Sequence, residues 1–285
     1  MPDLNFIPHP LVGTPYGAAL DLCIILAIIA YLLSVITREY SWVDRLWTTC
    51  PPIYCLIVAA SLDFESARVN LMTLLVLLWG ARLTFNYARK GGFAKGGEDY
   101  RWLEIRKRIG PFRFQLLNLV FIAPGQMLIV WLFTAPIHIA WMHQDAPLNW
   151  IDIVTALVFF TLWIGEIVGD EQMWRFQQEK KHKIAAGEPV GQGFITSGLF
   201  AWSRHPSYFC ELGMWWSFYW FTIAASGQLV NWTMPGFILL TMVFFGSSRL
   251  AESISLSKYP SYTDYQASTP RIIPFTGIGK IRRSG

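Results

Sequence analysis

Two ionisable residues at the start of a predicted membrane helix are of types that suit phosphate binding. Arg204 and His205 immediately precede Pro206, inside the polar stretch Ser197–Glu211. Proline suits the first turn of a helix, because its missing N–H would be unpaired there in any case. The positive end of that helix favours an anion, and the two basic residues reinforce this preference. The segment therefore predicts a site for a phosphate-bearing ligand.

Glu211 lies about one turn inside the apolar part of the same helix. An ionisable group at that depth in a membrane is costly, so it is treated as a functional residue by default. The alternative is a basic anchor at the membrane interface, in which Glu211 pairs with a structural arginine.

A second polar cluster, formed by Glu166, Asp170 and Gln172, closes the preceding apolar block. Glu166 and Asp170 are four residues apart and share one helix face. Such acidic groups could accept hydrogen bonds from a ribose or an amide, or pair with Arg204 or Arg249. The alternative is a solvated helix end.

A third cluster follows the run Trp79–Tyr87. Arg82 lies within an apolar block, so it requires an acidic partner or a bound anion. Tyr87 lies at the end of the block and could donate a proton or a hydrogen bond. An aromatic residue at the membrane interface is an equally good interpretation of Tyr87.

The last cluster begins with Arg249, whose planar guanidinium suits bidentate recognition of phosphate or carboxylate. Glu252 follows it three residues later. Tyr259, Tyr262 and Tyr265 recur at intervals of three and share one stripe of a helix, which could flank a flat ring or simply pack on the bundle.

The usual motifs of soluble enzymes are absent. The sequence contains no GxGxxG following a strand, no GxxxxGK[ST], no HExxH and no GxSxG. The five histidines show no metal-ligand spacing and the four cysteines form no CxxC pair, so no metal site is predicted. Any nucleotide cofactor must be held by side chains of a helical bundle.

The elements that must position these residues are apolar blocks about as long as a bilayer is thick. Of the 285 residues 53% are hydrophobic and only 15% charged, which excludes an ordinary soluble protein. The blocks predict an all-α polytopic membrane protein with about seven transmembrane helices, forming a single helical membrane domain over residues 1–285. They are Gly17–Ile36, Leu46–Leu62, Val69–Tyr87, Phe114–Met142, Trp150–Gly169, Leu212–Val230 and Pro235–Gly246. The fourth is overlong and contains Pro124 and Pro136, so it is expected to be a tilted span with an interfacial end.

The orientation follows from the lysines and arginines of the short loops. Eight lie in Ala88–Arg113 and five in Asp170–Pro206, whereas the alternate loops hold only Arg68. This predicts an N-terminus outside, a cytoplasmic C-terminus and an active site that faces the cytoplasm. The net charge of +4 reflects membrane topology, so no nucleic-acid partner is expected. No signal peptide is expected either, and the first span is predicted to be retained.

These segments together resemble a known superfamily. The run Ser203–Glu211, the pattern from Lys258 to Tyr265 and the closing Ile273-Pro274-Phe275 are similar to the C-terminal half of steroid 5-alpha-reductase-like membrane proteins. The chain is most similar to a largely uncharacterised branch of that superfamily. The elements typical of this branch are Ser41-Trp42-Val43-Asp44-Arg45-Leu46-Trp47, Trp79-Gly80-Ala81-Arg82-Leu83, Gly97-Glu98-Asp99-Tyr100-Arg101 and Asp170-Glu171-Gln172.

The resemblance implies a helical bundle around a cytoplasmic cavity for NADPH, with the cofactor half over approximately residues 150–275. It implies hydride transfer to a carbon–carbon double bond of a lipid such as a sterol or an enone. An acid must then stabilise the enolate oxygen, and Tyr87 matches the family's acid by position. The candidate cofactor-binding residues are Arg82, Glu166, Asp170, Gln172, Arg204, His205, Ser207, Tyr208, Glu211, Arg249 and Tyr262.

Two departures from the family pattern bear on this prediction. Ser207 stands where the family usually has asparagine, which removes one expected hydrogen bond to the cofactor. Characterised steroid reductases also use a glutamate of the second span to polarise the ketone. Leu46–Leu62 contains no carboxylate, so Asp44, the nearest one, is the second catalytic candidate.

Two other classes of function remain open. Isoprenylcysteine carboxyl methyltransferases share Arg-His-Pro-x-Tyr and the arginine of the seventh span, and they bind S-adenosylmethionine; they usually have two adjacent glutamates where this chain has only Glu252. A non-catalytic lipid-binding or scaffold protein would explain the spans but not Arg82 together with Glu211. The reductase is the preferred prediction, in the endoplasmic reticulum of a eukaryote or the inner membrane of a bacterium, with no obligate protein partner.

Overall fold

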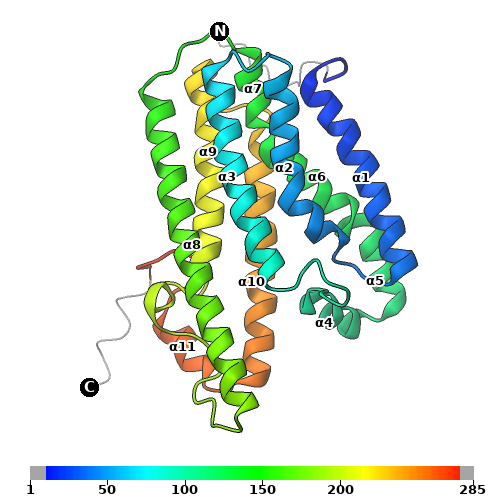
Figure 1. Cartoon of the computed structure of the whole chain (residues 1–285), viewed down its shortest axis with the longest axis vertical. Coiled ribbons are helices and arrows are strands. Elements are labelled where there is room, and N and C mark those ends of the chain that lie inside the picture. The colour runs from blue at the N-terminus through cyan, green and yellow to red at the C-terminus, as the bar shows by residue number, and fades with distance from the viewer. Residues whose placement is uncertain (1–10, 277–285) are drawn as a thin grey trace. The chain divides into compact units, whose positions relative to one another are not determined.

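The computed structural model describes residues 11–276, and the described chain is helical without any strand (Figure 1). The elements are α1 (Pro15–Thr37), α2 (Trp42–Ala60), α3 (Ala67–Arg89), α4 (Tyr100–Ile109), α5 (Pro111–Leu117), the π-helix η1 (Asn118–Ile122), α6 (Pro124–Thr134), α7 (Pro136–Met142), α8 (Trp150–Ala185), the 3₁₀-helix η2 (Gly198–Ala201), α9 (Pro206–Ser226), α10 (Met234–Lys258) and α11 (Tyr262–Ser268). The predicted all-α class is confirmed.

Five helical segments of the described chain are long and apolar enough to cross a membrane. They are Pro15–Thr37, Ala67–Arg89, Pro111–Thr134, Trp150–Ala185 and Met234–Lys258. α1 exposes Ile24, Ile25, Ile28 and Ile29, an apolar face that suits lipid rather than water. Both observations support an integral membrane protein. α2 and α9, which coincide with the predicted second and sixth spans, fall outside this set, so the count of seven stays a prediction.

The overlong fourth block is divided at its prolines. Pro124 begins α6 and Pro136 begins α7, each at a position where a helix tolerates the missing N–H. Two other helices, α8 and α10, continue well beyond their predicted apolar blocks, and α10 ends at Lys258. α8 continues to Ala185, where exposed ion pairs four residues apart, such as Glu171–Arg175, support its polar half. The predicted polar segments are therefore more helical than hydropathy alone indicates.

The packing divides the chain into two compact units: residues 1–159 with 215–240 form unit 1, and residues 160–214 with 241–285 form unit 2. In unit 1, α2 packs against α1, α3 and α6 (Figure 1). Gly80 of α3 permits the close approach of α2, because a Cβ there would lie 2.4 Å from Cγ of Pro52. Trp79, Phe133 and Trp215 form the adjacent aromatic core, with the Phe133 and Trp215 ring centroids 4.1 Å apart.

A buried ion pair closes the other end of unit 1. Arg68 at the start of α3 donates to both carboxylate oxygens of Asp152 on α8, at 2.8 and 2.9 Å, and both side chains are buried. The same guanidinium also donates to the backbone carbonyls of Ala146 and Pro147. The satisfaction of its N–H groups offsets the cost of burying the charge. Arg68, the one basic residue of the sparsely charged loops, is thus a structural residue.

Candidate functional site

In unit 2, two segments about 65 residues apart in sequence pair through their backbones. Arg204 N–H donates to the carbonyl of Pro270 at 2.9 Å, and His205 N–H donates to that of Arg271 at 3.0 Å. The Ser203 hydroxyl adds a bond to the carbonyl of Ile272 at 2.8 Å. The pairing ends at Pro206, where α9 begins as predicted. It brings the Arg-His-Pro motif and the C-terminal Pro-Arg-Ile segment into one polar centre.

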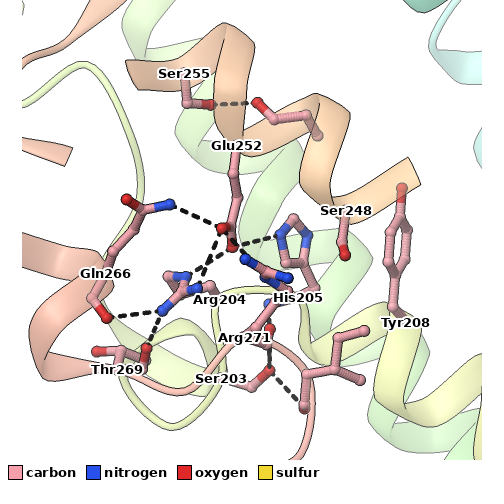
Figure 2. A network of polar contacts seen from close by, with 12 residues as sticks. Ser203, Arg204, His205, Tyr208, Ser248, Glu252, Ser255, Gln266, Thr269 and Arg271 are labelled. Carbon is pink, nitrogen blue, oxygen red and sulfur yellow. Dashed lines mark hydrogen bonds and ion pairs between the residues drawn. The ribbon is translucent and has the colours of Figure 1, made fainter. Parts of the chain in front are cut away.

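The Arg204 guanidinium lies inside this centre, where it binds protein acceptors (Figure 2). Its Nε donates to Oε1 of Glu252 at 2.7 Å and its Nη2 to Oε2 at 3.1 Å. Its Nη1 donates to the backbone carbonyls of Gln266 and Thr269. The hydrogen bonds of Arg204 therefore link α10 to the segment after α11. The predicted contact of Arg204 with a phosphate stays a prediction.

Glu252 on α10 is the residue on which the polar side chains of unit 2 converge (Figure 2). Besides Arg204, it accepts from His205 Nε2 at 3.1 Å, from Gln266 Nε2 at 2.8 Å and from Arg271 Nε at 3.3 Å. One buried carboxylate thus faces two guanidinium groups and an imidazole. If His205 is neutral, the two guanidinium groups and the one carboxylate leave this centre with a net charge of one positive unit.

Two arginines next to this centre retain donors that can reach a ligand. The Arg271 side chain is 34% exposed, and only its Nε has a hydrogen-bond partner among the described residues. Arg249 is exposed on α10, one turn before Glu252, with no hydrogen-bond or ion-pair partner among residues 11–276. His205 stacks on the ring of Tyr208, with centroids 5.1 Å apart. The surplus charge and the open donors fit an anionic ligand.

The acidic candidates of unit 2 are buried, as predicted for Glu211. Glu166 and Asp170 on α8 and Glu211 on α9 each expose less than a tenth of their surface. The Gln172 side chain binds the backbone, because its Oε1 accepts the N–H of Leu199 at 2.9 Å. A Cβ on Gly169 would lie 2.9 Å from Oγ of Ser207, so α8 and α9 meet closely there. The role of these residues toward a cofactor remains a prediction.

Tyr262 on α11 is buried and packs edge-on against Phe194, with ring centroids 4.9 Å apart. Burial, with the charge of Glu252 adding to it, raises the pKa of Tyr262 to about 12. Its hydroxyl therefore stays protonated and acts as a neutral hydrogen-bonding group.

Unit 1 contains a second polar centre, which includes both catalytic candidates. Asp44 lies in the first turn of α2, where Trp102 Nε1 of α4 donates to its Oδ2 at 3.0 Å. The buried Ser41 hydroxyl accepts the N–H of Asp99 at 2.9 Å, and Tyr87 lies near the end of α3. Both catalytic candidates thus belong to unit 1, and their catalytic roles stay predictions.

The Tyr87 side chain is held on two sides. A Cβ on Gly92 would lie 2.4 Å from the tyrosine ring, and Phe93 packs edge-on with its centroid 5.0 Å away. The hydroxyl itself is buried and completes no hydrogen bond with the described residues. A buried hydroxyl without a partner costs free energy unless a ligand or water supplies one.

The three carboxylates of this second centre have different environments. Burial alone would raise the pKa of Asp99, but hydrogen bonds from Arg101 Nε at 2.9 Å and Nη2 at 2.7 Å lower it below its ordinary value. Asp44 has no such partner, and burial together with the charge of Asp99 raises its pKa. Burial also raises the pKa of Glu98, although the N–H of Tyr40 donates to it at 2.6 Å.

Arg82 lies in α3 of unit 1 and is buried, as its place in an apolar block predicted. Several polar residues escaped the sequence-based prediction of the site, namely Ser41, Trp102, Gln266, Thr269 and Arg271. Glu252 was singled out only as the residue that follows Arg249. Charge balance is the signal that could have identified it, because a buried Arg204 requires an acidic partner.

Helices that can span a membrane and two buried polar centres define an all-helical membrane protein with polar sites inside its units. The chain belongs to the family described as Protein of unknown function (DUF1295), whose model matches residues 30–269. An uncharacterised protein of Schizosaccharomyces pombe is 35% identical over 286 residues, which cover 95% of this chain and 83% of that protein. No solved structure matches the chain.

Proposed function

We propose that this protein is an NADPH-dependent membrane reductase that transfers hydride to a carbon–carbon double bond of a sterol-like or enone-like lipid. The observation that carries the proposal is the surplus positive charge around Glu252, beside the start of α9. A cofactor with several phosphate groups compensates such a charge, and a helix N-terminus favours it further. The resemblance to steroid 5-alpha-reductase-like proteins supports the same cofactor.

The proposal gives the residues of unit 2 separate tasks. Arg249 and Arg271 pair with phosphate groups, because their guanidinium nitrogens are the open donors of the centre. Arg204 keeps Glu252 in place and so fixes the distance between α10 and Arg271. When bound, NADPH supplies the hydride. Asp170, Glu166 and Glu211 are the acceptors for ribose or amide groups.

The residues of unit 1 perform the proton chemistry. The Tyr87 O–H donates to the substrate oxygen as negative charge develops on it, which lowers the barrier to addition at the carbon beta to a carbonyl. The tyrosine suits this task because its ring is fixed by Gly92 and Phe93 while its hydroxyl keeps its hydrogen-bonding capacity unused. Asp44 supports the acid from the first turn of α2.

The proposed arrangement in the membrane has seven spans, with α2 and α9 added to the five apolar segments. The N-terminus is outside, and the basic loop before α5 faces the cytoplasm, as the distribution of lysine and arginine indicates. The active site then opens to the cytoplasmic pool of nucleotide. The membrane is the endoplasmic reticulum in a eukaryote and the inner membrane in a bacterium.

The test is thermal stabilisation of the detergent-purified chain by NADPH and, separately, by S-adenosylmethionine. A ligand that binds only the folded state at 100 times its Kd stabilises it by about 2.7 kcal/mol. We expect stabilisation by NADPH, and weaker binding in Arg271→Met. Arg175→Met is the matched control, because that arginine forms an exposed ion pair with Glu171. Stabilisation by S-adenosylmethionine alone would replace the reductase with the methyltransferase.

A further inference from the structure

Three large apolar side chains lie exposed beside the polar centre of unit 2. Trp202, Ile273 and Phe275 expose 51%, 54% and 61% of their surface. The rings of Trp202 and Phe275 contact each other, with centroids 4.9 Å apart. A single exposed apolar side chain needs no explanation, whereas a group of them marks a surface that contacts something other than water. We call these three side chains the apolar patch.

Hydropathy alone does not assign this patch to the membrane, because residues 270–276 lie outside every predicted apolar block. The structure returns this segment to the start of α9. The Arg204 N–H donates to the carbonyl of Pro270 at 2.9 Å, and the Ser203 hydroxyl donates to that of Ile272 at 2.8 Å. The patch side chains lie directly before and after these bonded residues in the sequence, so the patch is a fixed part of the fold.

The surface of α8 shows where the hydrocarbon of the membrane ends. Ile167 and Val168 are exposed apolar residues near the end of the apolar half of this helix. Within one further turn, Glu171 forms an exposed ion pair with Arg175. Charged groups in contact with hydrocarbon are costly, so the boundary between hydrocarbon and headgroups falls near Gly169.

The 3₁₀-helix η2 and the first turn of α9 lie level with this boundary. A Cβ on Gly169 would lie 2.9 Å from Oγ of Ser207 and 3.8 Å from Cδ1 of Leu199. Gln172, less than one turn further along α8, accepts the Leu199 N–H at 2.9 Å. Trp202 follows η2 directly, and the paired C-terminal segment is held beside it. The patch therefore lies near the depth at which headgroups meet hydrocarbon.

The headgroup region of a bilayer suits this patch better than a second copy of the chain does. Tryptophan and other aromatic residues gather at membrane interfaces, where an apolar ring and a polar N–H both find a suitable environment. A stable interface between two proteins buries about 800 Å² on each partner. Three half-exposed side chains supply only on the order of 300 Å². The patch by itself is too small to hold a dimer together.

We propose that Trp202, Ile273 and Phe275 form a membrane-interface anchor that inserts among the lipid headgroups beside the start of α9. The anchor lies on both of the segments that build the Glu252 centre. Its insertion therefore holds this polar centre at the membrane surface. The partner is the bilayer itself, so the inference does not depend on which ligand the centre binds.

Spin labelling of Phe275→Cys tests the anchor in lipid nanodiscs of phosphatidylcholine and phosphatidylglycerol. The native cysteines are buried, so the original chain treated with the label provides the background. The accessibility of the nitroxide is measured to oxygen, which concentrates in hydrocarbon, and to a water-soluble nickel chelate. Glu179→Cys on the polar half of α8 is the reference for water, and Ile28→Cys on the exposed apolar face of α1 is the reference for lipid.

We expect the ratio of oxygen to nickel accessibility at position 275 to be several times the ratio for Glu179→Cys. A ratio equal to that of Glu179→Cys would show that the patch faces water and would overturn the proposal. A label shielded from both reagents would overturn it as well, because protein rather than lipid would then cover the patch.

Ile273→Cys reports on the same segment and leaves the ring pair intact. In this labelled chain Trp202→Ser removes the larger ring, so we expect the nickel accessibility at position 273 to rise severalfold. Trp150→Ser is the matched control, because Trp150 is an exposed tryptophan at the start of α8. No rise with Trp202→Ser would refute a shared anchor. None of these measurements requires a nucleotide, so a failure of the proposed function would leave their outcome unaffected.

Discussion

Glu252 and Arg204 form a two-point ion pair in which each carboxylate oxygen accepts one guanidinium N–H, at 2.7 and 3.1 Å. The two residues lie 48 positions apart in the chain, and both are buried. The pair therefore joins the segment before α9 to the middle of α10. Its geometry also fixes the position of Arg271, which contacts the same carboxylate.

Glu252→Gln tests how much this ion pair contributes to the stability of the folded protein. The substitution keeps the shape of the side chain but leaves the buried Arg204 without a counter-charge. Removing one partner of a buried ion pair typically costs about 3–5 kcal/mol. We expect a clearly lower melting temperature in detergent.

Glu179→Gln on α8 is the matched control, because Glu179 forms an exposed pair with Lys183 four residues away. Exposed pairs of this kind contribute little to stability, so no measurable shift is expected. Equal melting temperatures for the two variants would show that the Glu252 centre does not stabilise unit 2.

The sequence alone was sufficient for the features that depend on one segment at a time. The start of α9 at Pro206 and the burial of Arg82 and Glu211 were predicted correctly, whereas the fourth block was expected to be one tilted span and is divided at Pro124 and Pro136. Each of these follows from proline geometry or from the place of a charge within an apolar block.

Features that depend on pairing between distant segments could not be predicted. The convergence on Glu252 requires the backbone bonds from Arg204 and His205 to residues 270 and 271, and no local pattern specifies them. Arg204 was expected to face a ligand, because it lies at the start of a helix. That position gives no information on the tertiary partner of Arg204. Likewise, hydropathy ends α8 at the last apolar residue, whereas its exposed ion pairs extend the helix to Ala185.

Gly80→Ala tests the contact between α2 and α3. The new Cβ would lie 2.4 Å from Cγ and 3.3 Å from Cδ of Pro52, and the rigid proline ring cannot rotate away. Overpacking of this kind costs roughly 1–3 kcal/mol, so we expect reduced stability. Gly246→Ala on α10 is the same substitution at a helical glycine with open space around it. It should be neutral or stabilising by up to about 1 kcal/mol. A Gly80→Ala protein as stable as Gly246→Ala would contradict the close approach of the two helices.

The opposite pKa shifts of Asp44 and Asp99 predict opposite pH dependences of stability. Because the pKa of Asp44 is raised in the folded protein, its contribution is present below the unfolded value of about 3.9 and is lost as the pH rises through the folded value. Asp44→Asn removes this loss, so its melting temperature relative to the original protein should increase from pH 4.5 to pH 8.

The contribution of Asp99 to stability has the opposite pH dependence. Its pKa is lowered, so its contribution is present above about 3.9 and is lost only as the pH falls through the folded value. Asp99→Asn should therefore lower the melting temperature at neutral pH, with a deficit that shrinks below about pH 4. Melting curves of both variants over the same pH series provide the measurement. Parallel curves for the two variants would show that Arg101 does not distinguish the two carboxyls.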